Sequence, residues 1–237
     1  MIHYLALVLM GPVFVVQGLY VRKVTPQLEE ATGARSGRCG QGKLLRLLLI
    51  GDSAAAGVGV HNQSKALSGN LVGALSEKFQ LEWQLLAKSG YTTKDTYDML
   101  IHQPKEHYDV VVASLGVNDV IKTLTTKDWL NHQKALVVFI REHFSCRQIV
   151  LTKIPPMEKF PALPPPLRWY LGRKARDFNR HLSHWTTSQD DCELIDINHR
   201  LTTEQMATDG FHPGPGIYQF WGQSIAQVIK TRWHSND

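Results

Sequence analysis

The chain has 237 residues, of which 43% are hydrophobic and 20% are charged. This composition supplies enough apolar side chains for a sizeable core and excludes a wholly disordered chain, and the length allows one or two domains. The formal net charge is +5, and residues 1–50 hold six basic residues against two acidic ones, a local excess of +4. The remainder is nearly neutral and has no recognised nucleic-acid-binding motif, which argues against a nucleic-acid partner.

An apolar run opens the chain. Over residues 4–21 only Gln17 is strongly polar, and Arg22 and Lys23 follow directly. A helix of this length would be roughly 27 Å long, slightly short of a hydrocarbon core of roughly 30 Å. We therefore expect residues 1–23 to form a hydrophobic membrane anchor.

Two alternatives to the anchor stay open. A cleaved signal peptide would carry positive charge before the apolar run, where only His3 lies. A buried or interfacial helix of the folded domain would be kinked at Pro12. If the run is an anchor, the basic pair after it slightly favours a cytoplasmic over an exported domain. Residues 24–43 mix Pro, Gly, Ser and charges without a hydrophobic period and are expected to form a linker.

From residue 44 onward, strand-like and helix-like patterns alternate. A nearly continuous apolar run such as residues 44–50 is typical of a strand buried on both faces. The alternation predicts one domain, residues 44–237, with a parallel sheet of about five strands covered by helices on both faces. The predicted strands are 44–50, 81–87, 108–115, 148–154 and 193–197. The predicted helices are 64–79 with Ser64 as N-cap, 93–101, 126–144, 167–185 and a final helix through 217–228.

Three short motifs follow predicted strands, at the edge where parallel sheets bind ligands. Gly-Asp-Ser after the first strand can expose the hydroxyl of Ser53 among small residues. Ser-Gly-Tyr after the second strand places a backbone N–H at Gly90. Gly-Val-Asn-Asp after the third offers the amide of Asn118 to a developing oxyanion. Each motif taken singly is equally a turn or a helix cap.

A fourth motif lies between the last strand and the last helix. Asp209 precedes His212 by three residues on a loop bounded by Gly and Pro. A carboxylate at that spacing can orient one ring nitrogen while the other faces a nucleophile. The pairing separates this histidine from the other ten in the chain.

Together and in this order, the four motifs resemble the blocks of the SGNH/GDSL hydrolase family. The resemblance spans roughly residues 44–233 and implies a flavodoxin-like, three-layer α/β/α fold. It also implies hydrolysis of small or lipid-derived acyl esters or thioesters through an acyl-enzyme, without a metal or organic cofactor. An O-deacetylase of carbohydrate or peptidoglycan and an acyltransferase are alternatives on the same residues. A catalytically silent binding protein is a third, against which the intact Ser, Asp and His set argues.

The resemblance also implies a role for each residue. Ser53 would be the nucleophile, His212 the general base and acid, and Asp209 the group that orients His212. The oxyanion hole would combine the backbone N–H groups of Ser53 and Gly90 with the side chain of Asn118. The stretch Lys-Ser-Gly-Tyr-Thr-Thr around Gly90 departs from the Asn-x-Gly of the family.

The remaining acidic residues of the motifs receive supporting roles. Asp119 is expected to hold its loop, and Asp52 is not the triad acid, because Asp209 has the right partner and spacing. The three cysteines form no Cys-x-x-Cys pair, so the sequence predicts no zinc site of that type.

Residues 154–168 are too rich in proline for a helix or a central strand. They follow the fourth predicted strand and should therefore lie at the active-site end. We expect an apolar rim or lid in which Met157, Phe160, Leu163 and Leu167 contact an acyl chain. A stiff surface connection is the alternative.

Overall fold

A computed structural model describes the backbone of residues 2–197 and 202–234, and the side chains of 10–197 and 202–233. Within these residues the strands form one six-stranded sheet in the order β1-β3-β2-β4-β5-β6. The strands from β2 to β6 run parallel, which confirms the predicted parallel sheet. Their bounds are β1 Ser36–Cys39, β2 Lys43–Gly51, β3 Phe79–Ala87, β4 Val110–Ser114, β5 Gln148–Thr152 and β6 Cys192–Ile195.

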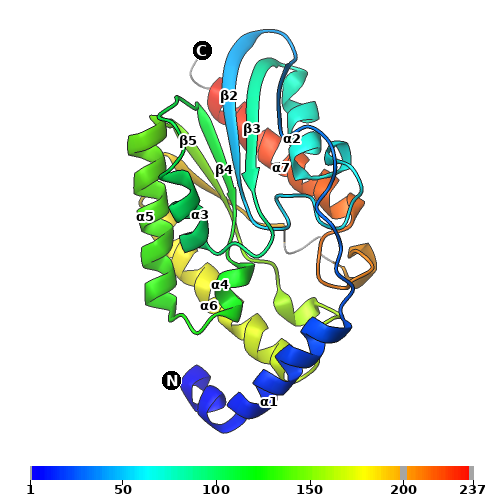
Figure 1. Ribbon diagram of the computed structural model, residues 1–237. Coiled ribbons are helices and arrows are strands. Elements are labelled where there is room, and N and C mark those ends of the chain that lie inside the picture. Colours follow the sequence, from blue (N-terminus) through cyan, green and yellow to red (C-terminus); the bar gives the residue numbers. More distant parts are fainter. Residues whose placement is uncertain (1, 198–201, 235–237) are drawn as a thin grey trace.

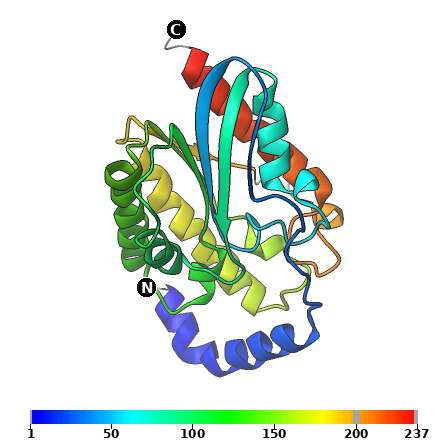
Figure 2. The same ribbon diagram turned by 45° about the horizontal axis from the view of Figure 1, so that its top comes forward.

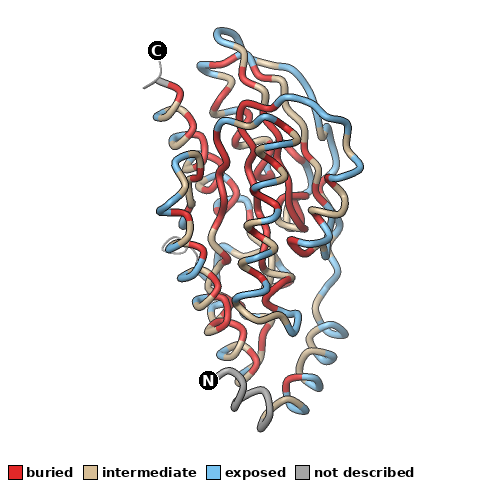
Figure 3. Tube along the Cα trace, turned by 90° about the vertical axis from the view of Figure 1, so that its left-hand side faces the viewer, coloured by how far each residue is buried: buried red, intermediate tan, exposed pale blue. Residues whose placement is uncertain are grey.

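Helices cover both faces of this sheet, so the molecule has the expected three layers (Figure 1). The helices α2 (Leu67–Ser76) and α7 (Pro215–His234) pack together on one face. The other face carries α3 (Thr93–Leu100), α5 (Thr126–Phe144) and α6 (Leu167–Thr186). Figure 3 shows the buried residues concentrated along the strands and the inner faces of these helices.

The central strands are buried on both sides, as their composition requires. All five residues of β4, Val-Val-Val-Ala-Ser, are buried, and β-branched side chains suit such a position. Along β2 alternate side chains enter opposite cores, Leu47 and Leu49 toward α2 and α7 and Leu48 toward α5. The parallel register pairs Gly51 with Ser114 of β4, so the carboxyl ends of the strands meet at one edge.

The sixth strand comes from the segment predicted to be a linker. Strand β1 pairs antiparallel with the outer edge of β3. Upstream of it, the Arg35 guanidinium pairs with the Glu30 carboxylate and also donates to the carbonyl of Ala87. Residues 30–39 are therefore held along the edge of the sheet, and β1 extends the sheet by one strand.

The predicted helix 64–79 is shorter than expected, and its N-cap was wrong. Residues Gln63–Lys65 form a 3-10 turn that is capped by the side chain of Asn62. Helix α2 starts after Ala66, which has no capping side chain, so Ser64 lies inside the preceding turn. The helix ends at Ser76 because the chain turns there and enters β3 three residues later.

The apolar N-terminal run forms helix α1 (Ile2–Val24), which contains Pro12 and lies against α6 (Figure 2). The Phe14 ring stacks on the ring of Tyr170 with 4.7 Å between centroids. Gln17 donates to the carbonyl of Pro165 and accepts from the backbone N–H of Leu167. Over the described residues, no helix has both the length and the apolar character needed to cross a membrane. The predicted spanning anchor therefore has no structural support.

Candidate active site

Ser53 lies in the turn that follows β2, at the carboxyl edge of the sheet. The turn begins at Gly51, where an added Cβ would stand 2.5 Å from the carbonyl oxygen of Ser114. The Asp52 carboxylate accepts from the N–H of Ala54, and the Asp52 N–H donates to the Ser114 carbonyl. This close approach to β4 requires glycine and fixes the direction in which the chain presents Ser53.

The structure brings Ser53, His212 and Asp209 together in one chain of hydrogen-bond contacts. The Ser53 Oγ lies 2.8 Å from His212 Nε2, and His212 Nδ1 lies 2.5 Å from Asp209 Oδ2. Ser53 and His212 are 159 positions apart in the sequence. A carboxylate at Nδ1 favours the tautomer with its proton there, which leaves Nε2 free to accept the serine proton.

Local hydrogen bonds hold the Asp209 carboxylate in place. It is buried, and its Oδ1 accepts from the backbone N–H groups of Phe211 and His212 at 2.9 and 3.0 Å. Burial raises the pKa of this carboxyl, but the hydrogen bonds from His212 and Phe211 outweigh it, so that the pKa falls below its ordinary value. Asp209 is therefore ionised at neutral pH and can stabilise a protonated His212.

The two further residues predicted for the oxyanion hole lie in the loop after β3 and in the first turn of α4. Gly90 follows β3 with a φ of +85°, a conformation that suits glycine. Asn118 opens helix α4 (Val117–Ile121), and its Nδ2 donates to the carbonyl of Tyr91 at 2.9 Å. The same nitrogen is 3.4 Å from Asp52 Oδ2, a much longer contact. Asn118 thus lies between the loop after β3 and the turn that carries Ser53.

Asp119 joins α4 to α3. It is fully buried and accepts from the backbone N–H and the hydroxyl of Thr93, each at 3.0 Å. Gln133 of α5 donates to the same hydroxyl at 2.9 Å. This buried network holds helix α4, which carries Asn118, against α3 and α5.

Asp52 is a titratable group of the site that sequence reasoning left aside. Its carboxyl is buried, which raises its pKa to about 7, even though the Ala54 N–H and the charge of His212 act in the opposite direction. Asp119 nearby raises the pKa further. Nothing in the sequence indicates this, because a Gly-Asp-Ser triplet does not disclose how deeply its carboxylate is buried.

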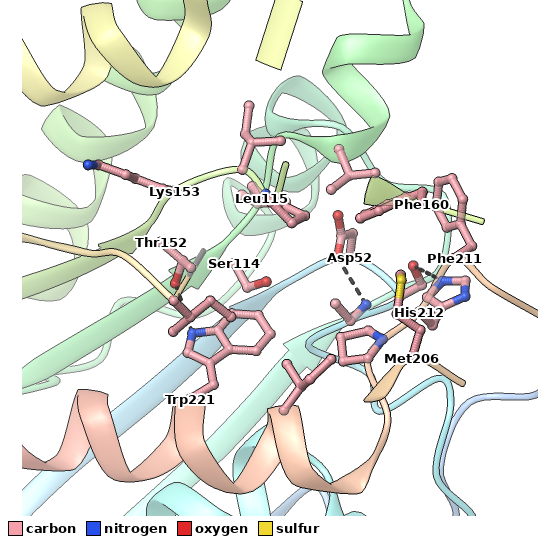
Figure 4. A pocket seen from close by; sticks show the side chains of 18 residues that line it. Asp52, Ser114, Leu115, Thr152, Lys153, Phe160, Met206, Phe211, His212 and Trp221 are labelled. Atoms are coloured by element: carbon pink, nitrogen blue, oxygen red, sulfur yellow. Dashed lines mark hydrogen bonds between the residues drawn. The ribbon is translucent and has the colours of Figure 1, made fainter. Parts of the chain in front are cut away.

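An apolar cavity opens beside Ser53 and His212 (Figure 4). It measures about 620 Å³ including its open mouth. Its walls come from the ends of β4 and β5, from the Pro-rich segment and from α7, where the indole of Trp221 donates to the Thr152 hydroxyl at 3.3 Å. Sequence reasoning missed the contribution of α7, whose apolar residues read only as a core-facing stripe.

The Pro-rich segment contributes less of this lining than predicted. Phe160 lines the cavity, and its ring meets that of Phe211 edge to face at 5.1 Å. Met157 and Leu163 are buried in the core on the α6 side of the sheet and are not among the lining residues. Met157 lies in a 3-10 turn (Met157–Lys159) packed on α6, so this part of the segment belongs to the core and not to the cavity wall.

Among the described side chains, those of residues 10–197 and 202–233, no group of three or more His, Cys, Asp or Glu is arranged to hold a metal ion. The chemistry that this site offers is that of a hydrogen-bonded serine, histidine and carboxylate beside an apolar cavity.

The family model described as GDSL-like lipase/acylhydrolase matches residues 49–220. A search of curated protein sequences gave no significant match.

Among solved structures, a lipase from a goat rumen metagenome, Lip_vut3, aligns with a TM-score of 0.63 at 19% identity, over 78% of this chain and 97% of that one. The psychrotrophic esterase EstA from Pseudoalteromonas sp. gives 0.61 at 18%, over 80% and 98%. The acetylxylan esterase Axe2 from Geobacillus stearothermophilus gives 0.57 at 18%, over 79% and 95%. At these identities the likeness shows the fold.

Proposed function

The chain belongs to the GDSL-like lipase/acylhydrolase family and is an ester-bond hydrolase, and from this premise we propose that it cleaves apolar acyl esters or thioesters through an acyl-enzyme on Ser53. The observation that supports the proposal is the series of hydrogen-bond contacts from Ser53 Oγ through His212 to the buried Asp209. Such a chain can deprotonate a hydroxyl at the moment of attack, which an isolated serine cannot do near neutral pH.

The proposed reaction has two halves. In the first, Ser53 Oγ attacks the carbonyl carbon while His212 Nε2 takes its proton; His212 then protonates the departing alcohol or thiol as the carbon–oxygen or carbon–sulfur bond breaks. In the second, His212 takes a proton from water, the hydroxide attacks the acyl group, and Ser53 recovers its proton as the acid leaves. Asp209 keeps its charge and stabilises the imidazolium formed in each half.

We further propose that the oxyanion is stabilised by the backbone N–H groups of Ser53 and Gly90 and by the Asn118 amide. The Asn118 N–H that faces Asp52 is held only by a 3.4 Å contact, while the other is bonded to Tyr91. A substrate oxyanion can accept from the weakly held N–H while the other N–H keeps its bond to Tyr91.

The lining of the cavity supports an apolar acyl group as substrate. Apolar atoms dominate its surface, and Leu115, Ile154 and Ile217 line it together with aromatic rings. An acyl chain there is removed from water at a gain of about 0.8 kcal/mol per buried methylene, whereas a sugar would leave its hydroxyls without hydrogen-bond partners. We therefore favour acyl-chain esters over acetylated carbohydrate.

Hydrolysis of p-nitrophenyl esters from acetyl to dodecanoyl tests this proposal. We expect kcat/KM to rise from acetyl to a medium-length chain and then to fall, and Ser53→Ala to abolish turnover of every ester. Ser188→Ala removes an exposed serine outside the site whose hydroxyl bonds only to the Trp185 carbonyl and to Gln189, and should leave the profile unchanged. A preference for acetyl esters would contradict the acyl-chain assignment, and turnover by Ser53→Ala would contradict the mechanism.

A further inference from the structure

Helix α1 has an inner face that is already occupied by the protein. Met10, Phe14, Gln17 and Val21 follow one another at steps of four, three and four residues and form one stripe. Met10 and Val21 pack against the core, Phe14 is buried, and both polar ends of the Gln17 amide are bonded to the backbone of 165–167. This stripe holds α1 along α6.

Outside this stripe, the surface of α1 is apolar and exposed to solvent. Of the ten exposed large hydrophobic side chains among the described residues, six lie on this one helix. Soluble proteins rarely leave contiguous apolar surface of this kind without a binding partner. The six are between 42% and 65% exposed: Val13, Val15, Val16, Leu19, Tyr20 and Val24. We call them the outer face of α1.

Exposed cations lie on α1, and an exposed indole lies on the neighbouring helix α6. Residues 2–24 contain no acidic residue, and Arg22 and Lys23 lie exposed at the end of the helix. Trp169 of α6 is 45% exposed, and its neighbours Arg168 and Tyr170 flank it on the turn that α1 contacts. The Arg173 guanidinium lies 6.0 Å from its ring. Apolar side chains, an interfacial tryptophan and cations together suit the headgroup region of an anionic bilayer.

The position of α1 links this surface to the cavity. The helix lies across the end of the molecule at which the parallel strands terminate (Figures 1 and 2). Gln17 bonds to Pro165, and the same Pro-rich segment supplies Phe160 to the cavity wall. A surface on which α1 rested would therefore lie beside the end of the domain that holds Ser53.

We infer that the outer face of α1, with Arg22, Lys23 and Trp169, docks in the plane of an anionic lipid bilayer without crossing it. The inner stripe stays packed on α6, and the six apolar side chains enter the headgroup boundary. The inference concerns binding alone and does not depend on turnover by Ser53.

The test measures flotation of the full-length Ser53→Ala protein with phosphatidylcholine vesicles, with and without phosphatidylglycerol. We expect binding to the anionic vesicles, and a loss of at least tenfold in Val16→Glu/Leu19→Glu, because two charges then enter the apolar contact. Arg22→Gln/Lys23→Gln should weaken the binding to anionic vesicles roughly tenfold or more. Val138→Glu changes an exposed apolar residue on α5, 45% exposed against 65% for Val16, and serves as the control, which should bind as the parent does.

The circular dichroism of each variant checks its folding. As a second check, each substitution is also made in the protein that retains Ser53, where hydrolysis of a soluble ester should be unchanged. Three results would overturn the inference. The parent protein fails to float, the outer-face variants float as well as the parent, or carbonate washing leaves the protein in the membrane as a spanning segment would. A concentration-dependent dimer that Val16→Glu/Leu19→Glu abolishes would also overturn it, since a second copy would then cover this face.

Discussion

At the scale of single residues, the site contains two carboxyl groups that differ in protonation state. Asp209 has a lowered pKa because hydrogen bonds from His212 and Phe211 favour its charged form. Asp52 has a pKa raised to about 7 because its burial is only partly compensated. Within one site, Asp209 therefore carries a constant negative charge, whereas Asp52 titrates near neutral pH.

The charge of Asp209 should contribute strongly to kcat. In Asp209→Asn the amide can hold His212 in the wrong tautomer, and we expect kcat to fall by about 10²–10⁴ with little change in stability. Steady-state kinetics on a soluble ester measures this loss. The matched control Asp177→Asn removes a carboxylate on the surface of α6 that pairs with Arg180, and should retain full kcat.

The raised pKa of Asp52 predicts a stability effect with a definite sign. The folded state binds this proton more tightly than the unfolded state, so the stabilisation is complete below the ordinary pKa of 3.8 and is lost as pH rises through about 7. Asp52→Asn should therefore be more stable than wild type at pH 8, on the order of 1 kcal/mol or more, and lose that advantage toward pH 4. Urea unfolding at the two pH values measures the difference. An advantage that is equal at both would contradict the assignment.

Sequence reasoning singled out Ser53, Asp209 and His212, which the structure brings into contact, because they lie in short motifs at the edge of the sheet where parallel strands end. It could not assign the state of Asp52 or the role of Trp221. Both depend on what packs around a side chain in three dimensions, and Trp221 has the same helical spacing as a core residue. The Pro-rich segment was placed at the right end of the sheet. Its buried Met157 shows why an apolar residue near a site need not line it.

At the scale of elements, the site is held by the tight junction of β4 with α4. Gly116 has a φ of +126°, and an added Cβ would stand 2.6 Å from the side chain of Ile154. This glycine starts the helix that carries Asn118 and Asp119, and it does so directly against the chain after β5.

Gly116→Ala should consequently lower both stability and turnover. We expect a loss of about 2–4 kcal/mol, from backbone strain together with the clash at Ile154, and a fall in kcat because Asn118 is displaced. Thermal unfolding and ester kinetics measure the two effects. Gly73→Ala in α2 is the matched control, because no atom lies within 4 Å of its Cβ, and helix propensity predicts a gain of up to about 1 kcal/mol. Equal effects at the two glycines would refute this reading of the junction.

The strand β1 shows where element prediction failed. Ser-Gly-Arg-Cys has no apolar alternation, and β1 exists because the outer edge of β3 offers unpaired backbone groups. Strand formation here is decided by the partner and not by the residues themselves, so a sequence pattern could not disclose it.

At the scale of the whole molecule, α1 belongs to the folded body of the protein. In the sequence the apolar run has no distinct sides. In the structure Phe14 and Gln17 pack one side of it against α6 and the chain before it. The inner stripe and the outer face can be told apart only from the contact with α6, which the sequence does not show. The sequence pattern therefore favoured a spanning helix.

If α1 is part of the fold, its inner stripe must stabilise the domain. Phe14→Ala should lower the free energy of unfolding by about 2 kcal/mol or more, since a buried ring stacked on Tyr170 is lost. Val16→Ala, on the exposed face of the same helix, should change it by less than about 0.5 kcal/mol. Denaturant unfolding of both full-length variants makes the comparison. No difference between them would mean that α1 is not coupled to the domain.

Covalent labelling by a fluorophosphonate, with mass spectrometry of the modified peptide, tests the catalytic role of Ser53 most directly. The account predicts one phosphonylated site, at Ser53, with labelling abolished in Ser53→Ala and greatly slowed in His212→Ala because the base that activates the hydroxyl is gone. Labelling of a different serine, or labelling at the wild-type rate in His212→Ala, would contradict the central claim.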